Sequence, residues 1–226
     1  MREAVVRSLV RIASAVVLTT VAAVVAPQPA MAQAGDPIVF VHGYRGQAAT
    51  WDDMKSKFAA SGYAQDRLHA FEYPAGISNA QAAERLDAYV GDVLAKTRAS
   101  KVDVVSHSMG ALNSRHWMKF LGGADVVDDW VGLGAPNHGT DTARLCADVA
   151  CQEMRPGSEF LNALNADDET HGAANYGNFW SDCDGVVQPA RSAVLEGATN
   201  VRVGCVHHVD LVRNREVYDQ VAAFVS

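Results

Sequence analysis

The chain has 226 residues, a net charge of −7 and an apolar fraction of 49%. This composition is sufficient for a sizeable buried core and excludes an intrinsically disordered chain. The sequence contains no basic run of the kind that binds phosphate backbones, so we expect no nucleic-acid partner.

The first 32 residues have the pattern of a secretory signal peptide. Three arginines precede an apolar run at residues 12–25, and Ala30-Met31-Ala32 forms a small-x-small cleavage site. The apolar run is shorter than the roughly 18 residues that a membrane span needs. The alternative to a cleaved signal peptide is an N-terminal anchor that is retained. We therefore expect a secreted, extracellular protein without a stable membrane span, whose mature domain comprises residues 33–226.

Short apolar runs alternate with amphipathic segments along this mature domain, as in α/β proteins. Residues 38–41 predict a strand buried on both faces. Trp51, Met54 and Phe58 then fall on one helical face, with Thr50 as the expected N-cap and Gly62 as the stop.

The later elements repeat this alternation. We expect helices at 78–97 and 109–121, an irregular region at 134–178 with one helix near 158–164, and a last helix around Val217 and Val221; strands are expected at 102–105, at 126–133, near Phe179 and at 201–206. Strands separated by helices predict a mostly parallel sheet whose functional site lies at the carboxyl ends of the strands.

Ser108 lies where a predicted strand passes directly into a predicted helix. A serine on such a sharp turn presents its hydroxyl above the sheet, provided that the residues two positions before and after it are small. Gly110 meets this requirement, and Ser106 stands where glycine is usual. The pattern predicts a nucleophile at Ser108; an ordinary helix N-cap is the alternative.

A nucleophilic serine of this kind needs two N–H groups that stabilise an oxyanion. The backbone N–H of Met109 opens the predicted helix and is one expected donor. Tyr44, in the loop after the first strand, is the expected second donor. We interpret the neighbouring His42 as a residue that fixes this loop rather than as a catalytic base.

Four motifs together resemble the class 2 triacylglycerol lipases of actinobacteria and bacilli, which are small secreted lipases of the α/β-hydrolase fold. These are Val41 to Tyr44, Ser106 to Gly110, Leu133 to Thr140 and a late histidine, and the likeness covers nearly all of residues 36–226. The resemblance implies an α/β-hydrolase fold with a mostly parallel central sheet and helices on both faces. It also implies a Ser-Asp-His triad, ester hydrolysis and no cofactor. We also expect little or no lid, because the mature domain barely exceeds the length that the sheet and its helices need.

The resemblance also assigns the acid and the base. In this fold they follow the last two strands, in the order serine, acid, histidine. Asp184 precedes a short apolar run and matches the family pattern better than Asp182. His208 occupies the family position before an apolar residue and is preferred to His207.

We therefore expect a secreted carboxylic ester hydrolase, a triacylglycerol lipase or esterase, with Ser108, Asp184 and His208 as its triad. It would act as a monomer on a lipid or another ester. A polyester hydrolase, a thioesterase or an acyltransferase would use the same machinery. A non-catalytic secreted binding protein is the alternative from a different class. The histidines and acidic residues lack the spacing of metal ligands, so we expect no metal.

The four cysteines, Cys146, Cys151, Cys183 and Cys205, all lie in the mature domain. An even number in an exported chain predicts two disulfides, and three pairings are possible. Cys183 and Cys205 adjoin the acid and base loops, which follow consecutive strands, so we expect these two to pair. Cys146 would then pair with Cys151 across a short loop.

Overall fold

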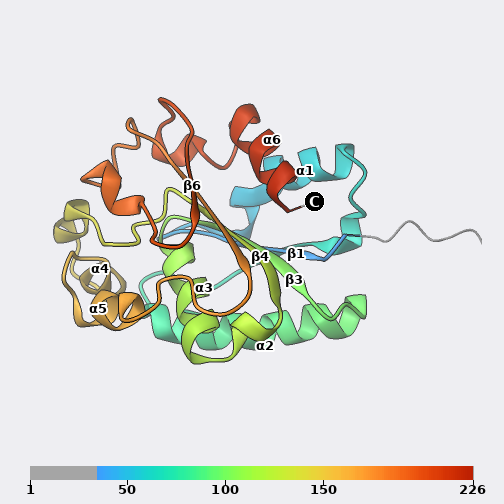
Figure 1. The fold of residues 1–226 in the computed structure, drawn as a ribbon, viewed down its shortest axis with the longest axis horizontal. Helices are drawn as coiled ribbons and strands as arrows, with labels where there is room; N and C mark the ends of the chain where they lie inside the picture. The colour runs from blue at the N-terminus through green and yellow to red at the C-terminus, as the bar shows by residue number, and fades with distance from the viewer. Residues whose placement is uncertain (1–34, 226) are drawn as a thin grey trace, which may run out of the picture. The chain divides into compact units, whose positions relative to one another are not determined.

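The computed structural model describes residues 35–225, so the signal peptide that we predict at residues 1–32 lies outside the described range. Six parallel strands form one sheet in the order β2-β1-β3-β4-β5-β6 (Figure 1). They are β1 (Ile38–Val41), β2 (Leu68–Phe71), β3 (Val102–His107), β4 (Val127–Leu133), β5 (Asn175–Trp180) and β6 (Thr199–Arg202).

Helices cover both faces of the sheet, which is the architecture of the α/β-hydrolase fold. In Figure 1, α1 (Asp52–Ala60) and α6 (Arg215–Phe224) lie on one face, and α2 (Asn79–Thr97) and α3 (Met109–Phe120) lie on the other. The long connection from β4 to β5 contains two short helices, α4 (Val149–Glu153) and α5 (Glu159–Asn165). Within residues 35–225, no helix combines the length and the apolarity needed to cross a membrane.

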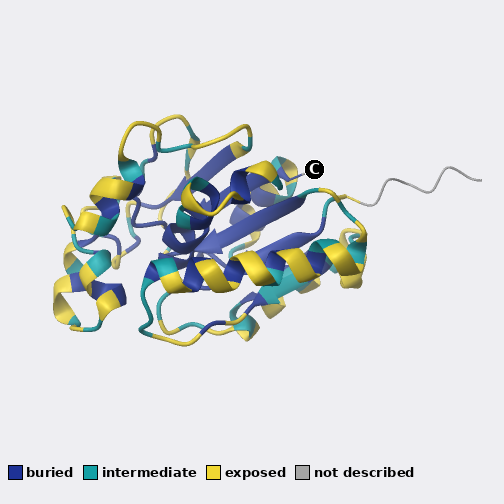
Figure 2. Ribbon diagram, turned by 90° about the horizontal axis from the view of Figure 1, so that it is seen from below, coloured by how far each residue is buried: buried dark blue, intermediate teal, exposed yellow. Residues whose placement is uncertain are grey.

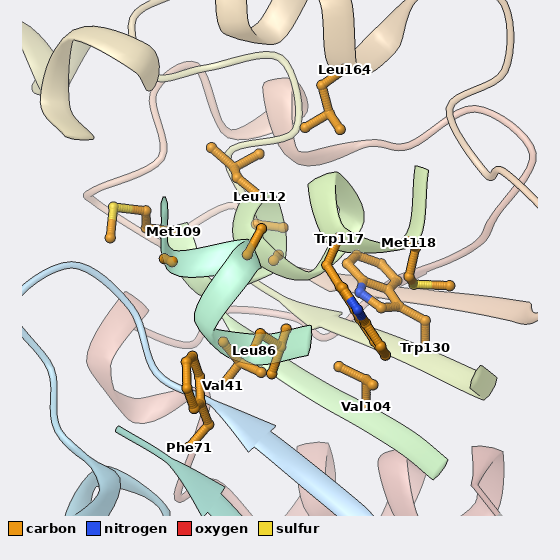
Figure 3. Packing of buried hydrophobic residues seen from close by; sticks show 14 of the residues in the cluster. Val41, Phe71, Leu86, Val104, Met109, Leu112, Trp117, Met118, Trp130 and Leu164 are labelled. Atoms are coloured by element: carbon orange, nitrogen blue, oxygen red, sulfur yellow. The ribbon is translucent and has the colours of Figure 1, made fainter. Parts of the chain in front are cut away.

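The alternation of side chains along the strands divides the core into two layers. In β1, Val39 and Val41 pack with the layer of α2 and α3, whereas Ile38 and Phe40 pack with the layer of α1 and α6. Successive side chains of a strand point to opposite faces, so both layers use the same fully buried strands, which are dark in Figure 2. Figure 3 shows the first layer, where Trp117 and Trp130 pack beside Val104.

Several elements of the structure differ from what the sequence led us to expect. A 3-10 helix (Ala48–Trp51) precedes α1, so Thr50 lies within that turn and is not the N-cap of the longer helix. The sequence pattern did not indicate β2, an edge strand whose middle residues are only half-buried. The strand β6 occupies 199–202, where we expected 201–206.

β5 begins at Asn175, inside the region that we expected to be irregular. Its polar residues are accommodated by tertiary contacts. The buried Asn178 donates to the carbonyl of Ala193 at 2.8 Å and to Asn200 Oδ1 at 2.8 Å. Gly177 leaves room for the ring of Phe224, because a Cβ there would lie 3.0 Å from it. Local hydrophobic patterning could not indicate a strand whose polar groups are paired across the fold.

Candidate active site

Ser108 lies between β3 and α3, at the carboxyl end of the sheet, in a backbone conformation that is unusual for a side-chain-bearing residue. Its φ is 55° and its ψ is −128°. Residues outside glycine rarely adopt positive φ, and such strain is concentrated at functional sites. The Ser108 N–H donates to the Leu133 carbonyl at 2.9 Å, which anchors the turn to β4.

Two glycines allow the backbone to pass close to this turn. A Cβ on Gly110 would collide with the carbonyl oxygens of Val41 and His42. A Cβ on Gly43 would lie 2.7 Å from Ser108 Cβ, so the loop after β1 can approach the serine only without a side chain at this position. Glycine is therefore required by close approach at both positions.

Ser106, which replaces the usual glycine of the motif, takes part in a buried polar link. Its hydroxyl lies 2.9 Å from the Ser114 hydroxyl, and Ser114 in turn accepts a hydrogen bond from Trp130 Nε1 at 2.8 Å. The link joins β3, α3 and β4 beneath the turn. A buried hydroxyl is costly unless it is hydrogen-bonded, and this link explains why serine is accommodated here.

Asp184 and His208 are joined by a buried hydrogen bond of 2.8 Å from His208 Nδ1 to Asp184 Oδ2. Asp184 Oδ1 accepts the N–H groups of Val186 at 2.9 Å and Val187 at 2.7 Å. The His208 N–H also donates to the Asp184 carbonyl at 3.0 Å. Only 4% of the Asp184 surface and 6% of the His208 surface are exposed. The two residues are therefore held as one unit by backbone and side chain.

The neighbouring candidates have different surroundings. Asp182 is exposed and forms an ion pair with Arg202. His207 is exposed and precedes the 3-10 turn that begins at His208. The sequence offered two candidates for the acid and two for the base. Asp184 and His208 are the pair joined by a hydrogen bond.

His107 links the serine turn to His208. Its Nε2 lies 3.0 Å from the His208 carbonyl oxygen, and the two ring centroids are 4.6 Å apart. Burial, together with the proximity of His208, lowers the pKa of His107 to about 3. The ring is therefore neutral at pH 7, and Nε2–H donates to the carbonyl. The sequence pattern gave no indication of this contact.

The two expected oxyanion donors both lie in segments that adjoin Ser108. Met109 is the first residue of α3, and N–H groups in the first turn of a helix have no intrahelical acceptor. Tyr44 follows Gly43 in the loop that approaches Ser108. His42 stacks on Tyr73 with the ring centroids 4.1 Å apart, and the Tyr73 hydroxyl donates to the His42 carbonyl at 2.6 Å. These contacts hold the start of the loop.

A cavity of about 180 Å³ opens beside Ser108. Its lining is mostly apolar, with contributions from the loop after β1, from Ser108 itself and from the connection after β4; the lining residues are Tyr44, Ser108, Pro136, Thr140, Thr142, Ala143, Cys146, Met154, Val186 and Val187. Larger hollows exist, such as one of about 390 Å³ that Asp129 and Phe224 line, but that hollow contains no hydroxyl beside a histidine–carboxylate pair. Of these two hollows, the cavity at Ser108 is the one lined by the predicted nucleophile.

Both disulfides have the pairing that we expected. Cys183 pairs with Cys205 across a Cα separation of 4.8 Å, directly beside Asp184. Cys146 pairs with Cys151 across 5.8 Å, at the beginning of α4. One bridge therefore adjoins the acid and base loops, and the other adjoins the wall of the cavity.

The fold is that of an α/β hydrolase, and comparison with known proteins identifies the family. The family described as "Lipase (class 2)" matches residues 35–223. The chain therefore belongs to the class 2 lipase family, as the sequence motifs predicted.

Individual relatives match less of the chain. It is 30% identical over 126 residues to triacylglycerol lipases of Pseudarthrobacter phenanthrenivorans and Burkholderia plantarii, a match that covers 50% of this chain and 37% and 33% of theirs. The chain thus spans about a third of the length of these relatives. Among solved structures, the mature form of a Bacillus licheniformis lipase has a TM-score of 0.77 at 20% identity and covers 86% of this chain and 93% of its own. Aspergillus fumigatus lipase B has a TM-score of 0.71 at 21% identity, covering 81% and 51%. At these identities, the two structures support the fold.

Proposed function

We propose that this protein is a secreted serine hydrolase that cleaves carboxylic esters, with triacylglycerols or related lipid esters as substrates. The observation that carries the proposal is the buried His208–Asp184 pair at the end of the sheet where Ser108 occupies its strained turn. Membership of the class 2 lipase family and the triacylglycerol lipases among the relatives support the choice of substrate.

The hydrogen bond to Asp184 determines which nitrogen of His208 acts as the base. Because Nδ1–H donates to Asp184 Oδ2, the lone pair of Nε2 is available to accept the Ser108 proton. The deprotonated Oγ attacks the ester carbonyl, and a tetrahedral oxyanion forms. When the tetrahedral intermediate collapses, His208 gives the proton to the departing alcohol, and the acyl group stays bound to Ser108 as an acyl-enzyme.

Water completes the cycle. It loses a proton to His208, attacks the acyl-enzyme and releases the carboxylic acid, after which the proton returns to Ser108. In both halves, the N–H groups of Tyr44 and Met109 would stabilise the oxyanion. A single donor of this kind is worth about 10²–10³ in kcat.

The cavity and the disulfides support the rest of the proposal. An acyl chain would lie against the apolar wall formed in part by Met154, Val186 and Val187. Two disulfides are typical of proteins that fold in an oxidising compartment, which supports secretion.

Ser108→Ala tests the catalytic proposal. We expect kcat on p-nitrophenyl esters to fall by about 10⁶, because triad members act as a unit, while the melting temperature stays near that of the wild type. An alkyl phosphonate should label Ser108 stoichiometrically in the wild type. Full activity of the alanine variant, or labelling at another residue, would contradict the assignment.

The same assay separates the alternative functions. Profiling p-nitrophenyl esters of increasing acyl length distinguishes an esterase from a lipase. Turnover of thioesters, or acyl transfer to an added alcohol in preference to water, would favour a thioesterase or an acyltransferase. A wild type that neither turns over esters nor reacts with the phosphonate would favour a non-catalytic binding protein.

A further inference from the structure

The side chain of Tyr44 makes a contact that the proposed mechanism does not use. Its hydroxyl donates to Asp148 Oδ2 at 2.5 Å, although the two residues are 104 positions apart. The hydrogen bond joins the loop after β1 to the beginning of α4. Tyr44 and Ser108 line the same cavity, so the bond spans from the region of the nucleophile to the connection after β4.

Asp148 is itself held by several contacts. It is the N-cap of α4, and its Oδ1 accepts the Cys151 N–H at 3.0 Å. The Cys146–Cys151 disulfide closes around it. Arg155 donates to the Cys146 carbonyl at 2.9 Å and to the Ala143 carbonyl at 3.3 Å. The loop that carries Asp148 is therefore held in place by these contacts, and its second carboxylate oxygen, Oδ2, accepts the hydrogen bond from Tyr44.

The far end of α4 is also anchored. Glu153 Oε2 accepts two hydrogen bonds from Asn79, one from the backbone N–H at 2.6 Å and one from Nδ2 at 2.8 Å. Asn79 is the first residue of α2, which packs against the sheet. These hydrogen bonds connect α4, which begins after Asp148, to α2 of the core.

The loop that carries Tyr44 is a tight turn. Arg45 has a φ of 54°, and the Gly46 N–H donates to the Gly43 carbonyl at 3.0 Å. Left-handed residues other than glycine are strained and persist only when surrounding contacts stabilise them. The hydrogen bond from the Tyr44 hydroxyl to Asp148 is one such contact. Tyr44 directly follows Gly43, the residue that lies against Ser108.

We propose that Asp148 is a positioning residue: by accepting the Tyr44 hydroxyl, it holds the loop after β1 at the distance from Ser108 that the oxyanion requires. This inference rests on the proposed function, in which the Tyr44 N–H is an oxyanion donor. Donors must lie within about 2.7–3.1 Å of the oxyanion, so small displacements reduce stabilisation of the transition state. The hydrogen bond to Asp148 also raises the pKa of Tyr44.

Four variants separate positioning from folding. Tyr44→Phe removes the hydroxyl and keeps the ring. Asp148→Ser keeps an N-cap for α4 but is too short to reach Tyr44, whereas Asp148→Asn keeps the cap and offers an amide to the Tyr44 oxygen. Tyr63→Phe is the matched control, because the Tyr63 hydroxyl donates to the Val225 carbonyl, which is not part of the cavity lining.

We expect Tyr44→Phe and Asp148→Ser each to lower kcat roughly tenfold, with KM within about twofold, since oxyanion contacts act in the transition state. The double variant should be no slower than the slower single variant, because both remove the same bond. Asp148→Asn should recover most of the wild-type kcat, and Tyr63→Phe should retain it.

Any of three results would overturn the proposal: an unchanged kcat in Asp148→Ser, losses that multiply in the double variant, or an Asp148→Asn variant as slow as Asp148→Ser. Phosphonate labelling of Ser108 is followed in every variant. Labelling and turnover of the wild type show that the proposed function holds even if the positioning role does not, whereas a wild type without either refutes the function itself.

Discussion

The two ends of the sheet each bury an aspartate, and they accommodate it differently. At the carboxyl end, Asp184 accepts two backbone N–H groups and the N–H of His208. At the amino end, Asp103 on β3 accepts the Asp129 N–H at 3.3 Å. There, carboxylate oxygens of Asp36, Asp103 and Asp128 lie within 4.8 Å of one another.

Burying an ionised carboxyl group is unfavourable, and the two ends of the sheet compensate for it in different ways. Donors surround Asp184 at the end where we propose the chemistry. Burial, together with the nearby carboxylates of Asp129 and Asp36, raises the pKa of Asp103 to about 8. Asp103 is therefore protonated in the folded state over much of the range in which an exposed aspartate is ionised. The comparison predicts that substitutions at the carboxyl end change activity, whereas those at the amino end change stability.

Asp184→Asn should produce the largest effect among the variants at these two carboxyl groups. An amide at this position favours the wrong His208 tautomer, so we expect kcat to fall by about 10⁴ with the fold retained. Kinetics on a short p-nitrophenyl ester and thermal melting measure the two quantities. Asp182→Asn, at an exposed residue two positions before Asp184, is the matched control, and equal losses in both variants would contradict the assignment of the acid.

Gly134→Ala tests how precisely the acid–base pair is packed. Gly134 has a φ of 56°, and a Cβ there would lie 2.9 Å from Asp184 Oδ2 and 3.1 Å from His208 Nδ1. We expect a loss of about 10² in kcat from the displaced pair. Gly91→Ala in the interior of α2, where a Cβ meets nothing within 4 Å, should stabilise by about 0.5–1 kcal/mol and leave kcat unchanged. Wild-type kcat in Gly134→Ala would show that the pair tolerates displacement.

The two disulfides should differ in their contribution to stability. Replacing Cys183 and Cys205 together by serine should cost about 3 kcal/mol and lower activity, because this bridge closes the longer loop and adjoins Asp184. The Cys146 and Cys151 double variant should destabilise less, since its loop is shorter. Melting temperatures and kcat of both variants check the order. A larger melting-temperature loss in the second variant would reverse it.

Asp103→Asn should give the smallest effect, and the size of this effect depends on pH. The unfolded chain releases this proton near pH 4, but the folded protein holds it to about pH 8. The stability linked to this proton is fully present below pH 4, falls as the pH rises from 4 to 8, and is lost once the pH has passed 8.

Asparagine keeps an acceptor for the Asp129 N–H and has no proton to lose. We therefore expect Asp103→Asn to melt at nearly the wild-type temperature at pH 4 and several degrees higher at pH 8.5. Asp92→Asn, on the exposed surface of α2, is the control. A melting-temperature difference that is the same at both pH values would show that Asp103 is not protonated by its surroundings, and kcat should not change in either variant.

The order of elements and the candidate residues could be read from the sequence because they depend on local pattern. The buried run of β1, the capping box of α2 at Ser78 and the strand-to-helix passage at Ser108 each occupy a few consecutive residues. Family resemblance added Asp184 and His208, which the structure brings together. The class 2 lipase family was predictable for the same reason, because its motifs are short and ordered along the chain.

Tertiary structure alone decided the remaining features. The edge strand β2 and the beginning of β5 at Asn175 carry weak local patterns and are stabilised by neighbouring strands. The bond from Tyr44 to Asp148 and the carboxyl cluster at Asp103 join residues that lie far apart in the sequence. Side-chain periodicity reports which face of an element is buried, but it contains no information about which distant group completes a hydrogen bond or shares a buried charge. Those partners come together only when the chain folds.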